Sequence, residues 1–257
     1  MDKISTLEIF NFAKDISVKA GKILQESQDK FDIVKQKDIQ DIATSSDIAS
    51  EKFLIDCILK KYPNHSIYSE EIGDIKNDTS YRWVIDPLDG TKEYVRGIPQ
   101  WNCSIAFQFN NETITSCVYR PYEDVLYSAG KGLGSYKNNQ KIEVSKVEKL
   151  EEAFVYCYIP SYKRNQDRYE WAFKSLSEIG KKVYRLRSIS DENTALCWLA
   201  KGGCEAYLNL SNPPKEHDIL PGLFVANEAG AYNPKLKMPL IVANNKKIFD
   251  QISKLLI

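Results

Sequence analysis

Apolar positions along the chain predict two amphipathic helices at its start. From Ser5 to about Lys30, apolar residues recur mostly at spacings of three and four, at Leu7, Phe10, Ala13, Ile16, Ala20, Ile23 and Leu24. This period is typical of a helix with one buried stripe. A second helix is predicted from near Asp47 to before Pro63, because proline disfavours helical geometry in the residue that precedes it.

Short apolar runs predict strands in the next part of the chain. One is expected at Ser66–Ser69 and a buried one at Arg82–Ile85, which Asp86 and Pro87 would end before a turn at Gly90–Thr91 that could open a helix. Three further β-rich runs, separated by turn residues, predict an antiparallel meander at Cys103–Phe109, Thr113–Tyr119 and Val125–Ala129.

The second half of the chain alternates strand and helix patterns. Strands are predicted near Ala153–Tyr158, Val183–Leu186 and Glu205–Leu208, and helices near Asp167–Glu178, Glu192–Ala200, Asp218–Ala229 and from Lys246. The fold class is therefore α/β, with mixed sheets and interleaved helices in one compact unit. A boundary near residue 150 would divide the chain into 1–150, an α+β half, and 151–257, an α/β half.

Composition narrows the class of protein. The 257 residues include 35 Lys+Arg and 35 Asp+Glu, so the formal net charge is zero. That balance argues against a nucleic-acid polymer or a membrane surface as a partner. A hydrophobic share of 43%, with 12 Gly and 10 Pro, is ordinary for a globular protein and excludes disordered and collagen-like classes.

Cysteine usage and the N-terminus predict a cytoplasmic protein. The six cysteines are scattered without a C-x-x-C pair, so reduced and mostly buried thiols are expected rather than a zinc site or a disulfide framework. Met1–Thr6 lacks the basic and apolar regions of a leader, and nowhere do about 18 apolar residues run together.

Three features look chemical but favour ordinary structural roles. Gly130–Gly134 reads G-x-G-x-G without a helix pattern directly after it, which favours a hairpin over a phosphate loop. The only two histidines, His65 and His217, offer little to a serine or cysteine triad, and no G-x-S-x-G motif occurs. Paired lysines at predicted helix ends or turns suit helix C-termini or plain solvation.

Acidic residues at predicted strand ends carry the chemistry. Asp86 and Asp89 lie three apart after an apolar strand, and Glu70 and Glu71 follow another. Two like charges about 4 Å apart repel by roughly 4 kcal/mol at an effective dielectric near 20, so such a cluster must take up protons or bind cations. Oxygen-only ligands favour Mg²⁺ over Zn²⁺. The alternative is an ordinary acidic turn capped by Asp86.

The segment Trp83–Tyr94, WVIDPLDGTKEY, resembles the signature of the inositol monophosphatase superfamily of Mg²⁺-dependent phosphatases. Three other sequence blocks of that family occur in the family's order along the chain. They are Ala43–Asp47 and Ser69–Glu71, before the signature, and His217–Asp218 followed by Phe224–Gly230, after it. The resemblance covers nearly the whole chain. It implies a layered αβαβα sandwich of the inositol monophosphatase and fructose bisphosphatase type, with a largely antiparallel sheet in the first half and a second, smaller sheet.

The resemblance also implies a role for individual residues. Oxygens of Glu70, Asp86, Asp89, Asp218 and the Leu88 carbonyl would hold two or three Mg²⁺, which would activate a water molecule for attack on the phosphate. Thr91, paired with Asp47, would help Glu70 to deprotonate or orient that water. Backbone N–H groups of Gly90 and Thr91 would cradle the phosphate, and Asp218 would also contact the substrate.

The residues that would indicate the substrate match the nucleotidase branch of the family only in part. Lys92 and Glu93 followed by Tyr94 resemble the 3'(2'),5'-bisphosphate nucleotidases, which remove the 3'-phosphate of adenosine 3',5'-bisphosphate. The nucleotidase specificity blocks are replaced by Ile159–Tyr162 and Asp191–Ala195, so a pocket for a second phosphate would need compensation from nearby cations, namely Lys163, Arg164, Arg185 or Arg187.

Two departures leave other readings open. Asn209 stands where inositol phosphatases carry an acid that holds the polyol, and His217 replaces the family's tryptophan. His217 would be a packing substitution, a neighbour that supports the ligands, or a substrate contact. An inositol or sugar monophosphatase, a phosphatase of another 3'-phosphorylated nucleotide and a metal-dependent binding protein without turnover are the alternatives. Lithium inhibition and a homodimer are further expectations from the relatives.

Overall fold

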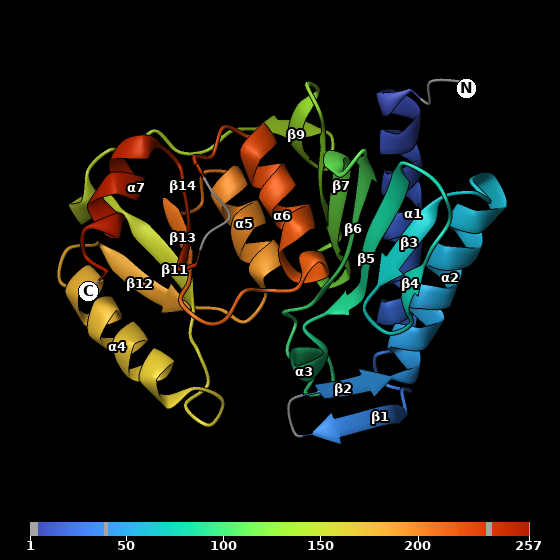
Figure 1. Cartoon of the computed structure of the whole chain (residues 1–257), viewed down its shortest axis with the longest axis horizontal. Coiled ribbons are helices and arrows are strands. Elements are labelled where there is room, and N and C mark those ends of the chain that lie inside the picture. Colours follow the sequence, from blue (N-terminus) through green and yellow to red (C-terminus); the bar gives the residue numbers. More distant parts are fainter. Residues whose placement is uncertain (1–4, 39–40, 235–237, 257) are drawn as a thin grey trace.

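Helices and sheets alternate in five layers in the computed structural model, which describes residues 5–38, 41–234 and 238–256 (Figure 1). Helices α1 (Thr6–Ser27) and α2 (Ser45–Lys61) cover one face of an eight-stranded sheet. Helices α5 (Glu192–Ala200) and α6 (Glu216–Glu228) lie between that sheet and a four-stranded sheet. The outer layer is formed by α4 (Gln166–Gly180) and α7 (Lys246–Ser253). The predicted αβαβα sandwich is confirmed.

The larger sheet is antiparallel except where β3 runs parallel to β5, in the order β10-β9-β8-β7-β6-β5-β3-β4. Its strands are β3 (Ser66–Ser69), β4 (Gly73–Ile75), β5 (Tyr81–Asp89), β6 (Asn102–Phe109), β7 (Glu112–Arg120), β8 (Val125–Gly130), β9 (Gly134–Lys137) and β10 (Gln140–Ile142). This arrangement confirms the meander, and the β8–β9 hairpin confirms that the glycine-rich segment is a turn.

The smaller sheet has the order β12-β11-β13-β14 and is mixed. Strand β11 (Phe154–Tyr158) is parallel to β12 (Arg185–Ser188) and β13 (Ala206–Asn209), whereas β14 (Leu240–Ala243) is antiparallel to β13. A separate hairpin joins β1 (Ile33–Asp38) and β2 (Asp41–Thr44), and the short helices are α3 (Thr91–Tyr94), η1 (Pro121–Glu123) and η2 (Leu150–Glu152).

Three hydrophobic clusters fill the spaces between the layers. One joins α1 and α2 to the larger sheet, around Trp83 and Trp101; a second packs α5 and α6 between the sheets; and a third lies beneath α4 and α7. Helix α1 approaches β7 so closely at Gly21 that a Cβ there would lie 2.3 Å from the Tyr119 ring. The glycine inside this predicted helix therefore permits close helix–sheet packing.

The sequence predictions differ from the structure mainly at strand ends. Strand β5 does not end at Asp86 but continues to Asp89, because the pairing with β6 shifts register there and Pro87 needs no ladder hydrogen bond. Strand β12 lies two residues later than predicted. The sequence analysis missed several short strands, including β14, although its run Leu240–Ala243 is wholly apolar and bounded by Pro239 and Asn244.

The structure bears on only some of the other sequence predictions. Among the residues that the structure describes, no helix is both long and apolar enough to cross a membrane. All six cysteines are free, and five of them are buried. The division at residue 150 stays a prediction; strand β10 ends at Ile142 and β11 begins at Phe154. The leader prediction concerns Met1–Thr6, of which Met1–Ile4 lie outside the described residues, and it stays a prediction.

Candidate active site

The C-terminal end of β5 carries two carboxylates, the buried Asp86 and the partly buried Asp89, on an irregular stretch of backbone. Asp86 Oδ1 accepts a hydrogen bond from the Leu88 N–H at 3.1 Å. The buried Ser50 hydroxyl of α2 donates to the Pro87 carbonyl at 3.0 Å, which fixes the segment between the two acids. Because pairing shifts register between Asp86 and Asp89, both carboxylates can face the same side of the strand end.

A glycine turn places Thr91 directly after these acids. Gly90 has φ +89°, and a Cβ at this position would lie 2.7 Å from the Gln100 carbonyl, so only glycine fits. The one-turn helix α3 then begins at Thr91, as the sequence predicted. The Thr91 hydroxyl lies 3.1 Å from the Leu88 carbonyl and 3.3 Å from Asp47 Oδ1, and can donate its single proton to either.

Asp47 is held in place by the start of α2. Its Oδ2 accepts hydrogen bonds from the backbone N–H of Thr44 at 2.9 Å and from the Thr44 hydroxyl. These bonds belong to the capping box at the start of α2. Burial raises the pKa of Asp47 to about 6. The predicted pairing of Thr91 with Asp47 is thus present in the structure, with Asp47 behind the threonine rather than on the cleft wall.

Glu70 is positioned by a buried residue that the sequence analysis missed. Glu51 of α2 accepts hydrogen bonds from the Ser69 hydroxyl at 2.5 Å and from the N–H groups of Glu71 and Ile72 at 3.2 Å each. These bonds fix the turn after β3, which carries Glu70. A glutamate on an inward position of a predicted helix was the available signal, but such residues are usually salt-bridged on the surface.

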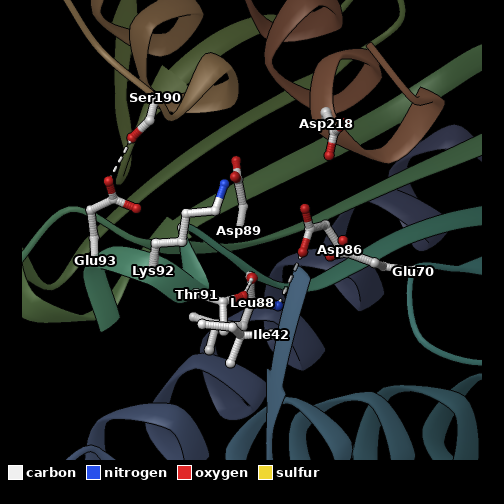
Figure 2. Close-up of a pocket in the computed structure, with 11 residues that line it drawn as sticks. Ile42, Glu70, Asp86, Leu88, Asp89, Thr91, Lys92, Glu93, Ser190 and Asp218 are labelled. Atoms are coloured by element: carbon white, nitrogen blue, oxygen red, sulfur yellow. Dashed lines mark hydrogen bonds between the residues drawn. The ribbon is translucent and has the colours of Figure 1, made fainter. Parts of the chain in front are cut away.

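Asp218 comes from α6, in the second half of the chain. Its Oδ2 accepts from the Lys215 N–H at 3.1 Å, which caps the first turn of the helix. Figure 2 shows the Asp218 side chain descending from α6 toward Asp86, Asp89 and Glu70. Residues more than a hundred positions apart therefore meet at one place.

The acidic side chains and Thr91 line one cleft of about 160 Å³ (Figure 2). Of the predicted site residues, the cleft brings together Glu70, Asp86, Leu88, Asp89, Gly90, Thr91 and Asp218, while Glu71 is not among its lining residues. On the far wall, the Ser190 hydroxyl donates to Glu93 Oε1 at 2.8 Å, a contact between the two halves of the chain.

Burial and the charges of neighbouring acids make Asp86 and Asp89 costly to ionise. Burial raises the pKa of Asp86 well above its ordinary value, and the charges of Glu70, Asp89 and Asp218 raise it further. Burial likewise raises the pKa of Asp89, together with Asp191 and Asp218. A divalent cation would relieve this repulsion, and the oxygen donors fit a hard ion such as Mg²⁺.

Amide side chains from both halves support Asp89. Its Oδ2 accepts from Asn102 at 3.0 Å and from Asn193 at 3.2 Å. Asn193 is fully buried and also donates to the His217 carbonyl at 3.1 Å, while its Oδ1 accepts from the Gly222 N–H at 2.8 Å. Neither asparagine was predicted from the sequence, because amides carry no charge pattern that marks them.

The two histidines have different surroundings. His65 stacks on Tyr62 with ring centroids 4.6 Å apart and accepts a hydrogen bond from Trp83 Nε1 at 3.1 Å. These contacts agree with the structural role predicted for His65. His217 instead reaches the acidic cluster, with Nε2 3.2 Å from Asp218 Oδ1 and 3.7 Å from Glu70 Oε1. Burial lowers the pKa of His217, but the Asp218 and Glu70 carboxylates outweigh burial and raise it to about 9.

A second pocket adjoins the cleft at Asp218. Its walls are mostly hydroxyl, amide and proline groups with two cations, and include Ser161, Arg164, Asn165, Glu192, Asn209, Ser211, Asn212 and Lys215. Asn209 Nδ2 donates to Glu192 Oε1 at 2.8 Å. Of the cations expected to compensate for the missing nucleotidase blocks, Arg164 lines this pocket, whereas Arg185 and Arg187 lie exposed on the edge strand β12.

Comparisons with known proteins agree with this geometry. Residues 6–249 match the inositol monophosphatase family. The chain is 33% identical over 247 residues to the fructose-1,6-bisphosphatase/inositol-1-monophosphatase of Aquifex aeolicus, covering 93% of this chain and 92% of the relative. It is also 33% identical over 226 residues to the Nus factor SuhB of Vibrio cholerae, covering 87% of this chain and 83% of the relative.

A solved structure of the same family superimposes along almost the whole chain. The inositol monophosphatase of the cyanobacterium Anabaena (Nostoc) sp. PCC 7120 has a TM-score of 0.84 at 25% identity, with 98% of this chain and 96% of that chain covered. The chain therefore belongs to the inositol monophosphatase family of metal-dependent phosphatases.

Proposed function

We propose that this phosphatase hydrolyses a sugar or polyol monophosphate, with the phosphate in the cleft of Asp86 and Asp89 and the alcohol in the adjoining pocket. The observation that carries the proposal is the convergence of Glu70, Asp86, Asp89 and Asp218 on one cleft with Thr91 beside them. The phosphate-proximal and alcohol-proximal pockets share Asp218.

The carboxylates would hold the family's Mg²⁺. Glu70, Asp86, Asp89 and Asp218, with the Leu88 carbonyl, supply only oxygen donors of the kind that Mg²⁺ prefers. When bound, the ions supply charge neutralisation for the phosphate and lower the pKa of a water molecule. The number of ions, two or three, stays a prediction.

Thr91 and Glu70 are suited to handle the attacking water. When the Thr91 hydroxyl donates to Asp47 or to the Leu88 carbonyl, its lone pairs are free to accept from a water in the cleft. The Glu70 carboxylate faces the same space and can take the water's proton as general base (Figure 2). The N–H groups of Gly90 and Thr91 are proposed to contact the phosphate.

The adjoining pocket favours a polyhydroxylated alcohol. Amide and hydroxyl groups such as Asn209, Asn212 and Ser161 match the donors and acceptors of sugar hydroxyls. Glu192 supports this assignment, because Asn209 holds its carboxyl group, which provides a hydrogen-bonding group beside the position where inositol phosphatases carry an acid. One relative is named a fructose-1,6-bisphosphatase/inositol-1-monophosphatase, which supports the same substrate class.

Adenosine 3',5'-bisphosphate is the second candidate. The observations in its favour are Lys92 and Glu93, which line the phosphate cleft, and Arg164 in the adjoining pocket. None of the three relatives described above carries a nucleotidase name. With Arg185 and Arg187 on the edge of the smaller sheet, the cations available to a second phosphate are fewer than the sequence suggested.

Phosphate release with Mg²⁺ across a panel of substrates tests the assignment. The panel contains inositol 1-phosphate, fructose 1,6-bisphosphate, adenosine 3',5'-bisphosphate and its sulfated parent. We expect kcat/KM for a sugar or polyol phosphate to exceed that for the nucleotides by at least about tenfold, a difference of about 1.4 kcal/mol in transition-state binding. The reverse preference would establish the nucleotidase reading, and no release from any phosphomonoester would favour a binding protein.

A further inference from the structure

His217 is a buried side chain at the acidic cluster that the proposed reaction does not use. Its exposed fraction is 1%, and neither ring nitrogen makes a hydrogen bond with any residue that the structure describes. A buried polar group without a partner costs about 1–3 kcal/mol. The carboxylates of Asp218 and Glu70 partner the ring when it is protonated, whereas the neutral imidazole leaves the Nε2 lone pair facing the acidic cluster and open to a metal ion.

The ring is aimed at the carboxylates and held there. Nε2 lies 3.7 Å from Glu70 Oε1 and 3.2 Å from Asp218 Oδ1. The Tyr68 ring packs against the imidazole with centroids 5.6 Å apart, and Asn193 anchors the His217 carbonyl at 3.1 Å. The nitrogen is thus fixed against the acidic cluster from both its side chain and its backbone.

The distances suit shared coordination of one ion. Glu70, Asp86 and His217 each offer a ligand atom, and these atoms all lie within 4.8 Å of one another. Ligand atoms about 2.1 Å from a common ion are about 3.0 Å apart at a right angle and about 4.2 Å apart when opposite. The separation of 3.7 Å between Glu70 and His217 falls between these limits.

We propose that His217 Nε2 is a metal ligand, which joins Glu70 and Asp86 in a mixed nitrogen–oxygen site that prefers first-row transition-metal ions to Mg²⁺. Imidazole binds such ions well, whereas Mg²⁺ is best served by oxygen alone. The inference rests on the proposed function, because it concerns one ion site within the same cleft.

Electron spin echo envelope modulation on the Mn²⁺-loaded protein tests direct coordination, because a ¹⁴N nucleus bound to Mn²⁺ gives a distinct modulation. The chain has only two histidines, so an imidazole signal comes from His217 or His65. The variants are His217→Gln, which keeps a polar side chain, and His217→Trp, which restores the family's usual residue. His65→Gln is the matched control, since His65 is also buried but bonds to Trp83.

We expect the ¹⁴N modulation in the wild type and in His65→Gln, and its loss in both His217 variants. In titrations monitored by the free Mn²⁺ signal with Mg²⁺ as competitor, the preference for Mn²⁺ over Mg²⁺ should fall at least about tenfold in His217→Gln. Stoichiometric Mn²⁺ binding without ¹⁴N modulation, or modulation that persists in the His217 variants, would overturn this inference alone. Failure of the wild type to bind any divalent ion would overturn the proposed function as well.

Discussion

Single buried carboxylates bear on two properties of this protein, the proposed phosphatase chemistry and the stability of the metal-free fold. Asp86 is 1% exposed, and burial with three neighbouring acids raises its pKa. Glu192 is 6% exposed and lies on the wall of the adjoining pocket, where burial raises its pKa to about 8. At neutral pH, carboxyl groups with raised pKa values lower the free energy of unfolding of the metal-free protein, and we expect a bound ion to offset the part that is due to Asp86.

Asp86→Asn separates these two effects. Asparagine keeps the acceptor for the Leu88 N–H but removes one charge from the cluster. We expect phosphate release in Mg²⁺ to fall at least about a thousandfold, because an ion ligand is lost, while the metal-free protein unfolds at higher temperature. Thermal denaturation in EDTA and a phosphate assay measure the two outcomes; near-wild-type activity would refute the site assignment.

Glu192→Gln gives a pH-dependent change in stability. The folded-state pKa of about 8 lies above the unfolded value of 4.5, so the folded wild type retains a proton that the unfolded chain loses. The stability due to that proton is present below pH 4.5 and is lost as the pH rises toward 8. The free energy of unfolding of the variant, relative to that of the wild type, should therefore rise by up to about 1.4 kcal/mol per pH unit over this window.

Urea unfolding of both proteins in EDTA at several pH values between 4.5 and 8 measures this gain. A difference in the free energy of unfolding that stays constant across the window would show that Glu192 is ionised in the folded protein.

At the scale of elements, the end of β5 and the first turn of α3 decide whether the acids converge. The sequence predicted this strand and this turn, because the apolar run and the D-P-L-D-G-T motif mark them. It placed the strand end at Asp86, since Pro87 ordinarily stops a strand; the register shift against β6 is a tertiary effect that local pattern does not carry. Strand β1 was missed because its residues, IVKQKD, are mostly polar.

Gly90→Ala tests the turn, and Gly97→Ala is its matched control. Both glycines have positive φ, +89° and +67°, but a Cβ at Gly90 would lie 2.7 Å from the Gln100 carbonyl, whereas one at Gly97 meets nothing within 4 Å. We expect backbone strain to lower the free energy of unfolding of both variants by about 1 kcal/mol. The close contact at position 90 should lower it further in Gly90→Ala and reduce kcat of that variant at least tenfold. Equal kinetics in the two variants would mean that the turn does not position Asp89 and Thr91.

At the scale of the whole molecule, the site joins the two halves of the chain. Asp86 and Asp89 come from β5 of the larger sheet, and Glu70 comes from the turn after β3. Asp218 comes from α6, and Asn193 of α5 connects the two halves by donating to Asp89 and to the His217 carbonyl. The family motif allowed the sequence to predict which acids meet. The amides that hold them, and the pocket around Glu192, depend on packing between layers and could not be read from the sequence.

Because the ligands come from both halves, ion binding should stabilise the whole fold. A ligand at a hundred times its dissociation constant adds about 2.7 kcal/mol to the free energy of unfolding. We expect Mg²⁺ to raise the melting temperature of the wild type, and Asp218→Asn to lose most of that rise. Asn193→Leu should lower both the melting temperature in EDTA and the added effect of Mg²⁺; an unchanged Mg²⁺ effect would argue against its positioning role.

The six free cysteines provide a built-in report on opening of the fold. Five are buried, and burial raises the pKa of Cys103, Cys117 and Cys157 to about 12, while Cys57 on α2 is partly exposed. Alkylating reagents react with the thiolate, so we expect the buried thiols to react only after the layers separate. The rate at which the buried thiols are labelled would therefore time the opening of the fold without any engineered probe.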